Sequence, residues 1–200
     1  MFSGIISECG SITHIKKHKK GISVLIKIPS HLINHLKVGA SIAINGVCST
    51  VVSIKDSCVE IDYLPETLAK TNLNNLSILQ EVNIELSLKL SDFVSGHLVS
   101  GHIDETGKII SYTKDLQWHI LKVEFSNKYA QYIVKKGWIV INGIALTIVD
   151  VFSNSFTCHI IPHTHNVTIL SKCKVGDKVN LEFDMIAKYV EQILKINNKV

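Results

Sequence analysis

The sequence contains the same half twice, because residues from Met1 to about Leu88 reappear from Leu98 onward at a constant separation of 97 positions. No net insertion interrupts this correspondence over four separate segments. Such a repeat predicts two domains of one fold, joined near residues 91–97. The matched segments are 1–10 with 98–107, 42–47 with 139–144, 65–67 with 162–164, and 82–85 with 179–182.

Each half has the pattern of a small β domain. Its short apolar runs are rich in Val, Ile and Thr and lie between turn residues about every ten positions, which is typical of a barrel or sandwich. Asn45-Gly46 and Asn142-Gly143 each separate two such runs, and Asn-Gly supplies the positive φ angles of a two-residue hairpin turn. The runs of the first half are 22–28, 41–44, 47–54 and 59–63.

Helices are expected at three places. One short helix interrupts each half, at 31–36 with Ser30 as its cap and at 129–134 with Ser126 or Asn127 as its cap. The last segment has apolar residues at helical spacing along one stripe, and the first half has no equivalent. This amphipathic helix could pack against another subunit or against its own barrel, and the sequence leaves both open. The stripe is Ile186, Tyr189, Val190, Ile193 and Leu194.

Composition and charge exclude several classes of protein. Hydrophobic residues make up 46% of the chain, which is enough for a core and argues against disorder. The net charge is only +4, and the basic run 16–20 lacks aromatic residues, so a solvated turn is favoured over a nucleic-acid site. The five cysteines form no Cys-x-x-Cys pair, which favours a reducing cytosol. With no signal-like start and no long apolar run, we expect a soluble intracellular protein.

Few residues suggest chemistry on spacing alone. His97 and His102 would point to opposite faces of a strand, and no third ligand of fixed spacing accompanies His163 and His165, so metal binding is disfavoured. Cys48 follows the first hairpin turn, where a cysteine is usually a small hydrophobe.

The repeat itself points to paired ligand pockets. Thr67 and Thr164 each follow a proline after a strand, at matched places in the two halves. Asp184 corresponds to Ser87, so the pockets would be alike in shape but not in charge. No glycine-rich phosphate loop or nucleophile elbow is present in the sequence. The residues alone therefore indicate a duplicated β protein with two related small-ligand pockets.

Four segments, 1–6, 39–51, 65–73 and 96–104, together make the chain resemble the riboflavin synthase α-chain family over nearly its whole length. The resemblance implies an all-β fold of two tandem six-stranded Greek-key barrels plus a C-terminal amphipathic helix that joins three subunits. The implied divisions are 1–97 for the first lumazine-binding barrel, 98–185 for the second, and 186–200 for the oligomerisation helix and tail.

The activity that the resemblance implies is a dismutation of two 6,7-dimethyl-8-ribityllumazine molecules into riboflavin and 5-amino-6-ribitylaminouracil by four-carbon transfer. It implies a cytoplasmic homotrimer with two lumazines per site and no cofactor or metal. It also names lumazine synthase as a candidate partner and implies no contact with nucleic acid or membrane. The working site would lie between the first barrel of one subunit and the second barrel of its neighbour.

The resemblance also implies the site residues, and it assigns each opening segment to the pocket of its own half. Cys48, His102 and Thr147 would take catalytic or ring-positioning roles. The substrate-binding residues of the first pocket would be Gly4, Ile5, Ile6, Ser41, Ser49, Thr50, Asp62, Tyr63, Leu64, Pro65, Glu66 and Thr67. Those of the second pocket would be Gly101, Ile103, Lys136, Ala145, Leu146, Ile161, Pro162, His163, Thr164, His165 and Asp184.

Two departures from the family fall in the second pocket. Ala145 stands where the family usually has serine, and the stretch 163–170 lacks a leucine and a threonine that the family commonly shows. The loss of one hydrogen bond to a neutral group costs on the order of 1 kcal/mol. A non-catalytic lumazine or flavin carrier of the same fold is therefore the alternative to the enzyme. A barrel that binds oligonucleotides is disfavoured, because it would need exposed aromatics and a basic stripe.

Overall fold

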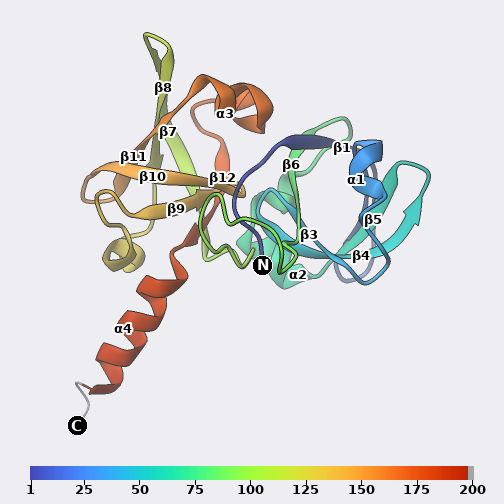
Figure 1. Ribbon diagram of the computed structural model, residues 1–200, viewed down its shortest axis with the longest axis horizontal. Coiled ribbons are helices and arrows are strands. Elements are labelled where there is room, and N and C mark those ends of the chain that lie inside the picture. The colour runs from blue at the N-terminus through green and yellow to red at the C-terminus, as the bar shows by residue number, and fades with distance from the viewer. Residues whose placement is uncertain (198–200) are drawn as a thin grey trace.

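The structure, a computed structural model, describes residues 1–197 and consists of two closed barrels and one projecting helix (Figure 1). The end of the expected segment 186–200, residues 198–200, lies outside the described residues. The first barrel contains β1 (Glu8–Lys17), β2 (Ile22–Lys27), β3 (Ser41–Ile44), β4 (Val47–Lys55), β5 (Cys58–Tyr63) and β6 (Glu81–Leu86). The second contains β7 (Glu105–Asp115), β8 (Trp118–Glu124), β9 (Trp138–Ile141), β10 (Ile144–Val151), β11 (Ser155–Ile160) and β12 (Lys178–Phe183).

The two barrels have the same topology. The first closes in the order β1-β2-β5-β4-β3-β6, and the second closes in the equivalent order β7-β8-β11-β10-β9-β12, with every neighbouring pair antiparallel. Because β2 lies beside β5 and not beside β3, the strands form a Greek key. The predicted fold class is confirmed.

The Asn-Gly hairpins are confirmed at both predicted places. Asn45 and Gly46 have φ angles of 48° and 80°, and Asn142 and Gly143 have 48° and 84°. Positive φ at both central residues defines a type I′ turn, whose twist matches that of the strands on either side. Each turn therefore sets the register of a strand pair, β3 with β4 and β9 with β10.

Alternation along the strands decides which side chains face a pocket. In β4, Val47, Ser49 and Val51 are buried inside the barrel, whereas Cys48 is half-buried and Thr50 is exposed on the outside. This follows from the two-residue period of a strand. Each barrel interior is filled by its own apolar cluster, so ligands can reach only the outer faces.

The short helices differ from the prediction. The segment expected at 31–36 is α1 (Ser30–Ile33), and the segment expected at 129–134 is the 3-10 helix η2 (Asn127–Tyr132). The predicted cap Ser30 is wrong, because Ser30 lies within its helix and Pro29 is at the cap position. Ser126 is at the predicted cap position of η2 but makes no capping hydrogen bond through its side chain, and Asn127 is the first residue of η2. The ring of proline fixes its φ angle, and its missing backbone N–H has no helical partner at the start of a helix in any case.

Two further helices were not predicted, and they carry residues of both expected pockets. They are α2 (Pro65–Lys70), followed by the 3-10 helix η1 (Asn72–Asn75), and α3 (Pro162–Val167), followed by η3 (Ile169–Lys172). Each α-helix starts with proline, which is favourable at the first position of a helix. The hydroxyl groups of Thr71 and Thr168 accept hydrogen bonds from Leu73 N and Leu170 N and so start the 3-10 turns.

The C-terminal helix is confirmed as α4 (Met185–Asn197), and it projects away from both barrels (Figure 1). Its apolar stripe is exposed, with Ile186 at 63% and Ile193 at 57% of full exposure, so the helix does not dock on its own barrel. Polar contacts to the second barrel hold its first half, among them Lys188 to Asp104 and Gln131 to Glu191. No helix among the described residues is long and apolar enough to cross a membrane.

Hydrogen bonds related by the repeat join the two barrels. Phe2 N donates to Val99 O at 2.8 Å, and Val99 N donates to Phe2 O at 3.0 Å. The buried amides of Asn83 and Asn180 reach across to the hairpin carbonyls of the opposite barrel, each at 2.9 Å. Buried amides that are satisfied in this way fix the relative orientation of the barrels, because breaking them would leave polar groups unpaired.

Candidate functional site

The opening segments of the two halves are exchanged between the barrels. Gly101 O accepts a hydrogen bond from Cys48 N of the first barrel at 2.8 Å, and Gly4 O accepts one from Ala145 N of the second barrel at 2.7 Å. Ile103 packs against the first core, whereas Ile6 is buried in the second core. The prediction that each opening segment lines the pocket of its own half is therefore wrong.

Two buried glutamates hold these exchanged segments. Glu182 of β12 accepts hydrogen bonds from Ser100 N, Ser100 Oγ and Gly101 N at 2.7, 2.7 and 2.8 Å. Glu85 of β6 accepts the matched set from Ser3 N, Ser3 Oγ and Gly4 N at 2.7, 2.7 and 3.1 Å. Burial raises the pKa of Glu85, and these hydrogen bonds oppose that effect. Each segment is thus tied to the end of its own barrel while its carbonyl group pairs with the other barrel.

The exchange produces a cavity of about 260 Å³ on the outside of the first barrel. One wall is β4, the second is α2, and the third is the segment that comes from the second half. An ion pair between Glu66 and Lys70 at 2.9 Å lies at the exposed rim. The cavity thus brings together a thiol, a hydroxyl, a charged rim and main-chain groups, which suits a small polar ring. Its lining is Val47, Cys48, Glu66, Thr67, Lys70, Thr71, Gly101, His102 and Ile103.

Other residues predicted for the first pocket point elsewhere. The hydroxyl groups of Ser49 and Tyr63 lie 3.0 Å apart inside the barrel, and both side chains are buried in the core. Burial raises the pKa of Tyr63, which therefore keeps its proton. Asp62 faces outward and accepts a hydrogen bond from Ser23 Oγ at 2.5 Å, and Ser23 lies 2.6 Å from His18 Nε2. Ser49 and Tyr63 can therefore contact a ligand only through their main chains.

The second barrel offers a similar but less polar face. Ala145 takes the place of Cys48, and Thr147 takes the place of Thr50 on the outside of β10. On α3, His163 is exposed and Thr164 is half-buried, but His165 turns toward the barrel, where its ring stacks on His119 at 3.8 Å between centroids. The side chain of His165 is therefore fixed by contacts with the second barrel.

Asp184 lies in a separate, largely apolar cavity of about 370 Å³ at the base of α4. Trp138 forms part of this cavity and stacks on His97, with centroids 5.1 Å apart. Burial lowers the pKa of His97, and Asp184 opposes this effect. Trp138 was missed by the sequence analysis, although the repeat offered a signal, because Trp138 corresponds to Ser41, which was predicted as a binding residue. Trp138 also pairs in register with Thr147.

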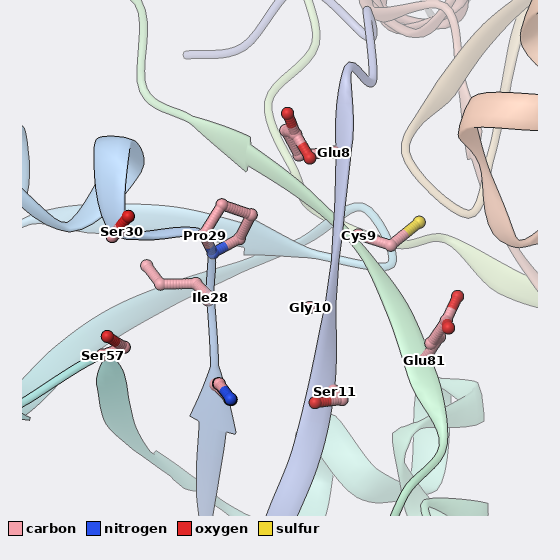
Figure 2. Close-up of a pocket in the computed structure, with 10 residues that line it drawn as sticks. Glu8, Cys9, Gly10, Ser11, Ile28, Pro29, Ser30, Ser57 and Glu81 are labelled. Carbon is pink, nitrogen blue, oxygen red and sulfur yellow. The ribbon is translucent and has the colours of Figure 1, made fainter.

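A larger hollow of about 570 Å³ lies at the far end of the first barrel (Figure 2). The hollow is lined by Ser57, which directly precedes β5, whereas the predicted site lies at the opposite end of this strand. In the second barrel the equivalent place is closed by a hydrogen bond from Ser126 N to Glu105. The counterpart of Ser126 is Pro29, which has no N–H, so Glu8 stays at the edge of the hollow (Figure 2). This hollow therefore differs from the equivalent place in the second barrel and lies away from the predicted ligand faces.

The histidines do not form a metal centre. His97 and His102 lie in the link between the barrels, so the prediction that they point to opposite faces of a strand does not apply. Within residues 1–197, no group of three or more His, Cys, Asp or Glu side chains is arranged to hold a metal ion. His102 lines the first cavity, and its N–H donates to Ser100 Oγ at 3.1 Å.

Comparison with known proteins points to one family. The lumazine binding domain matches residues 3–87 and again residues 100–184. The chain is 41% identical to the riboflavin synthase of Actinobacillus pleuropneumoniae over 97% of this chain and 90% of that protein. It is 38% identical to the riboflavin synthase of Chlamydia pneumoniae over 100% of both chains, and 37% identical to that of Bacillus subtilis over 100% of this chain and 92% of the relative.

Solved structures with this fold include the protein LumP. LumP complexed with riboflavin superposes with a TM-score of 0.87, and LumP complexed with 6,7-dimethyl-8-(1′-D-ribityl) lumazine superposes with 0.84, each at 21% identity. Each comparison covers 92% of this chain and at least 99% of LumP. At this identity the likeness shows the shared fold of two barrels.

Proposed function

This chain belongs to the riboflavin synthase family, and from that premise we propose that it converts two molecules of 6,7-dimethyl-8-ribityllumazine into riboflavin and 5-amino-6-ribitylaminouracil. One lumazine gives up a four-carbon unit and leaves as the diamine, and the other accepts the unit and becomes the flavin. The two substrate molecules contain all the atoms of the two products, so the reaction balances without an external oxidant or reductant.

The observation that carries the proposal is the duplication of one ligand-binding face. A reaction between two identical molecules needs two similar pockets, and β4 and β10 occupy equivalent places in the two barrels, each paired with the strand that precedes it. Holding two rings in an oriented pair replaces a bimolecular encounter, which is worth up to about 7–11 kcal/mol in ideal cases. In this proposal each half of the chain binds one of the two reacting lumazines.

We assign the first pocket to the cavity beside β4 and α2. Cys48 and Thr50 would contact the ring, and the main chain at His102 would complete the wall that the second half supplies. Removal and return of the 7-methyl protons requires a base and an acid, for which His102 and bound water are suitable. In the second pocket Thr147 and Thr164 take the corresponding places, and Asp184 would bind ribityl hydroxyl groups from the cavity near Trp138.

We further propose that the chain works as a homotrimer. The first cavity, at about 260 Å³, is below the usual range of about 300–1,000 Å³ for pockets that enclose a ligand. A second barrel from a neighbouring subunit would close it and bring two ligands face to face. The exposed apolar stripe of α4 supplies a surface that joins subunits.

The cellular setting is also a proposal. All five cysteines are free thiols, which suits a reducing cytoplasm. We propose the cytoplasm as the site of action and lumazine synthase as a partner that would hand over substrate. Co-sedimentation of the two purified enzymes tests the partnership, and separate migration at working concentrations would contradict it.

A lumazine or flavin carrier is the second candidate, because Ala145 lacks the hydroxyl group that the family usually places there. Incubation of the purified protein with 6,7-dimethyl-8-ribityllumazine alone separates the two functions. The enzyme forms one riboflavin for every two lumazines consumed, as read by flavin absorbance, whereas a carrier leaves the lumazine unchanged.

Variants of β4 provide a matched test of the site. Cys48→Ala and His102→Gln should lower turnover, and wild-type rates in both would remove their assigned roles. Thr50→Val should raise KM by about fivefold, since a lost hydrogen bond is worth about 1 kcal/mol. Val52→Thr is the control, because Val52 is on the same outer face of β4 but lies two residues further than Thr50 from Cys48, which lines the cavity.

A further inference from the structure

Three side chains meet between helix α3 and the second barrel. The ring of His165 stacks on the ring of His119 of β8, with centroids 3.8 Å apart and planes inclined by 10°. The hydroxyl group of Tyr112 of β7 lies 2.7 Å from His165 Nδ1. We refer to Tyr112, His119 and His165 as the aromatic anchor. It connects α3, which carries predicted second-pocket residues, to two strands of the barrel.

The first barrel holds the equivalent helix α2 in a different way. The positions that correspond to the aromatic anchor are Ile15, Ile22 and Leu68, and all three pack on the first apolar core. The same change occurs at a fourth position, where Cys173 beside Tyr112 corresponds to Leu76. Apolar contacts do not depend on protonation, so the set that holds α3 contains groups that titrate, whereas the equivalent set at α2 does not.

The surroundings of the aromatic anchor favour the neutral ring of His165. The titratable and charged groups that face it are Lys114 of β7 and the thiol of Cys173 after η3, and neither is an anion at neutral pH because burial raises the pKa of Cys173 to about 12. His119 Nδ1 is buried and has no hydrogen-bond partner among the described residues.

The hydrogen bond between Tyr112 and His165 also depends on whether the His165 ring is neutral. Burial raises the pKa of Tyr112, so its hydroxyl group keeps the proton and can donate it to His165 Nδ1 of the neutral ring. Protonation of Nδ1 would remove that acceptor, so the hydroxyl group would have to turn and accept from Nδ1–H, which leaves its own proton without the imidazole partner. Burial lowers the pKa of His165, and His119 and Lys114 lower it further. Since the unfolded chain binds the proton more readily, the anchor is intact above the ordinary His pKa of about 6.5 and is lost as the pH falls below it.

We infer that His165 is a positioning residue, and that the aromatic anchor releases helix α3 and the second pocket on acidification while α2 and the first pocket stay in place. His165 therefore acts through α3 and does not contact the substrate, contrary to the prediction that it binds ligand. The link from α3 to substrate rests on the proposed function, whereas the release of α3 does not.

Hydrogen exchange tests the release without any ligand. Amides of α3, such as His165 N bonded to Ile161 O at 3.1 Å, are compared with amides of α2, such as Leu68 N bonded to Leu64 O at 3.1 Å. After correction for intrinsic rates, protection of α3 should fall by about threefold between about pH 7.5 and about pH 5.5, in the direction that the lowered pKa of His165 sets. Protection of α2 should not change. Equal behaviour of the two helices would overturn the inference.

The first barrel supplies the matched variant. Tyr112→Ile, His119→Ile and His165→Leu together recreate the apolar set of the first half and should abolish the pH effect on α3. If this variant does not fold, Tyr112→Phe serves instead; without the donor to Nδ1, the midpoint of release should move to higher pH. A pH effect that survives the triple substitution, or a midpoint unchanged in Tyr112→Phe, would contradict the role of the aromatic anchor.

Kinetics then separate this inference from the proposed function. In the wild type, KM for 6,7-dimethyl-8-ribityllumazine should rise at low pH more than in the triple variant. A protein that shows the exchange effect but does not turn over the lumazine would retain the inference about α3 and refute the proposed function. A protein that turns over lumazine but shows no difference in exchange between α2 and α3 would retain the proposed function and refute the inference about α3.

Discussion

Gly101 offers the sharpest test of how the two barrels fit together. It has φ of +79°, and a Cβ atom added to it would lie 2.7 Å from Cys48 Cβ and 2.9 Å from Cys48 N. These neighbours belong to the start of β4 and cannot rotate away as the end of a long side chain would. Gly101→Ala therefore has to push the linking segment away from the first barrel.

The expected loss has two parts. An L-residue in the left-handed region costs about 1–2 kcal/mol. Displacement of the segment also breaks the 2.8 Å hydrogen bond from Cys48 N to Gly101 O, which adds about 1 kcal/mol. The free energy of unfolding should therefore fall by about 2–3 kcal/mol in total.

Gly39→Ala is the control, because Gly39 has φ of +84° but no heavy atom within 4 Å of an added Cβ. Its cost should be the conformational part alone, about 1–2 kcal/mol. Urea unfolding followed by tryptophan fluorescence measures both variants. Gly101→Ala should also reduce kcat/KM, because the segment carries His102 into the first cavity. An equal loss of stability in the two variants would show that the barrels do not approach as closely as described.

Three other outcomes are expected. Glu85→Gln should lose about 1–3 kcal/mol of stability, because an amide cannot accept from all three donors of Ser3 and Gly4. Burial raises the pKa of Glu85, so the native state binds its proton more tightly than the unfolded chain does. The difference in unfolding free energy between the wild type and Glu85→Gln should therefore shrink as the pH rises above the ordinary pKa of 4.5. A difference that grows with pH would contradict the raised pKa of Glu85. Ala145→Ser should tighten riboflavin binding by about fivefold in calorimetry, and unchanged affinity would show that the hydroxyl group meets no ligand. Ile193→Asp should shift sedimentation from trimer to monomer, whereas Gln192→Asp on the polar side of α4 should not.

The repeat carried most of the fold prediction. A constant separation of 97 positions fixed the number of barrels, and the Asn-Gly pairs at 45 and 142 fixed two hairpins with their register. These features are local or depend on comparing the sequence with itself, so no tertiary information was needed. The stripe of α4 was equally visible, because helical periodicity is a property of the sequence alone.

The exchange of the opening segments could not be predicted in this way. Gly4 and Gly101 occupy equivalent positions, so the sequence is the same whether each segment lies on its own barrel or on the other one. What decides between these arrangements is the close approach of Gly4 to Ala145 and of Gly101 to Cys48, which only exists once both barrels are placed. The helices α2 and α3 were missed for a related reason, since six residues are too few to show a helical period.

Comparison of the two halves shows which positions with positive φ require glycine and which accept a side chain. Gly39 corresponds to Lys136 and Gly176 to Leu79, and both of these residues carry a side chain at positive φ where an added Cβ meets nothing. Gly4 and Gly101 are glycine in both halves, because there an added Cβ would meet the other barrel. Positive φ alone therefore does not preserve glycine in this protein, whereas contact between the barrels does. Since that same contact carries His102 into the first cavity, the geometry that joins the barrels is also the geometry that builds the proposed first pocket, which the first barrel does not complete alone.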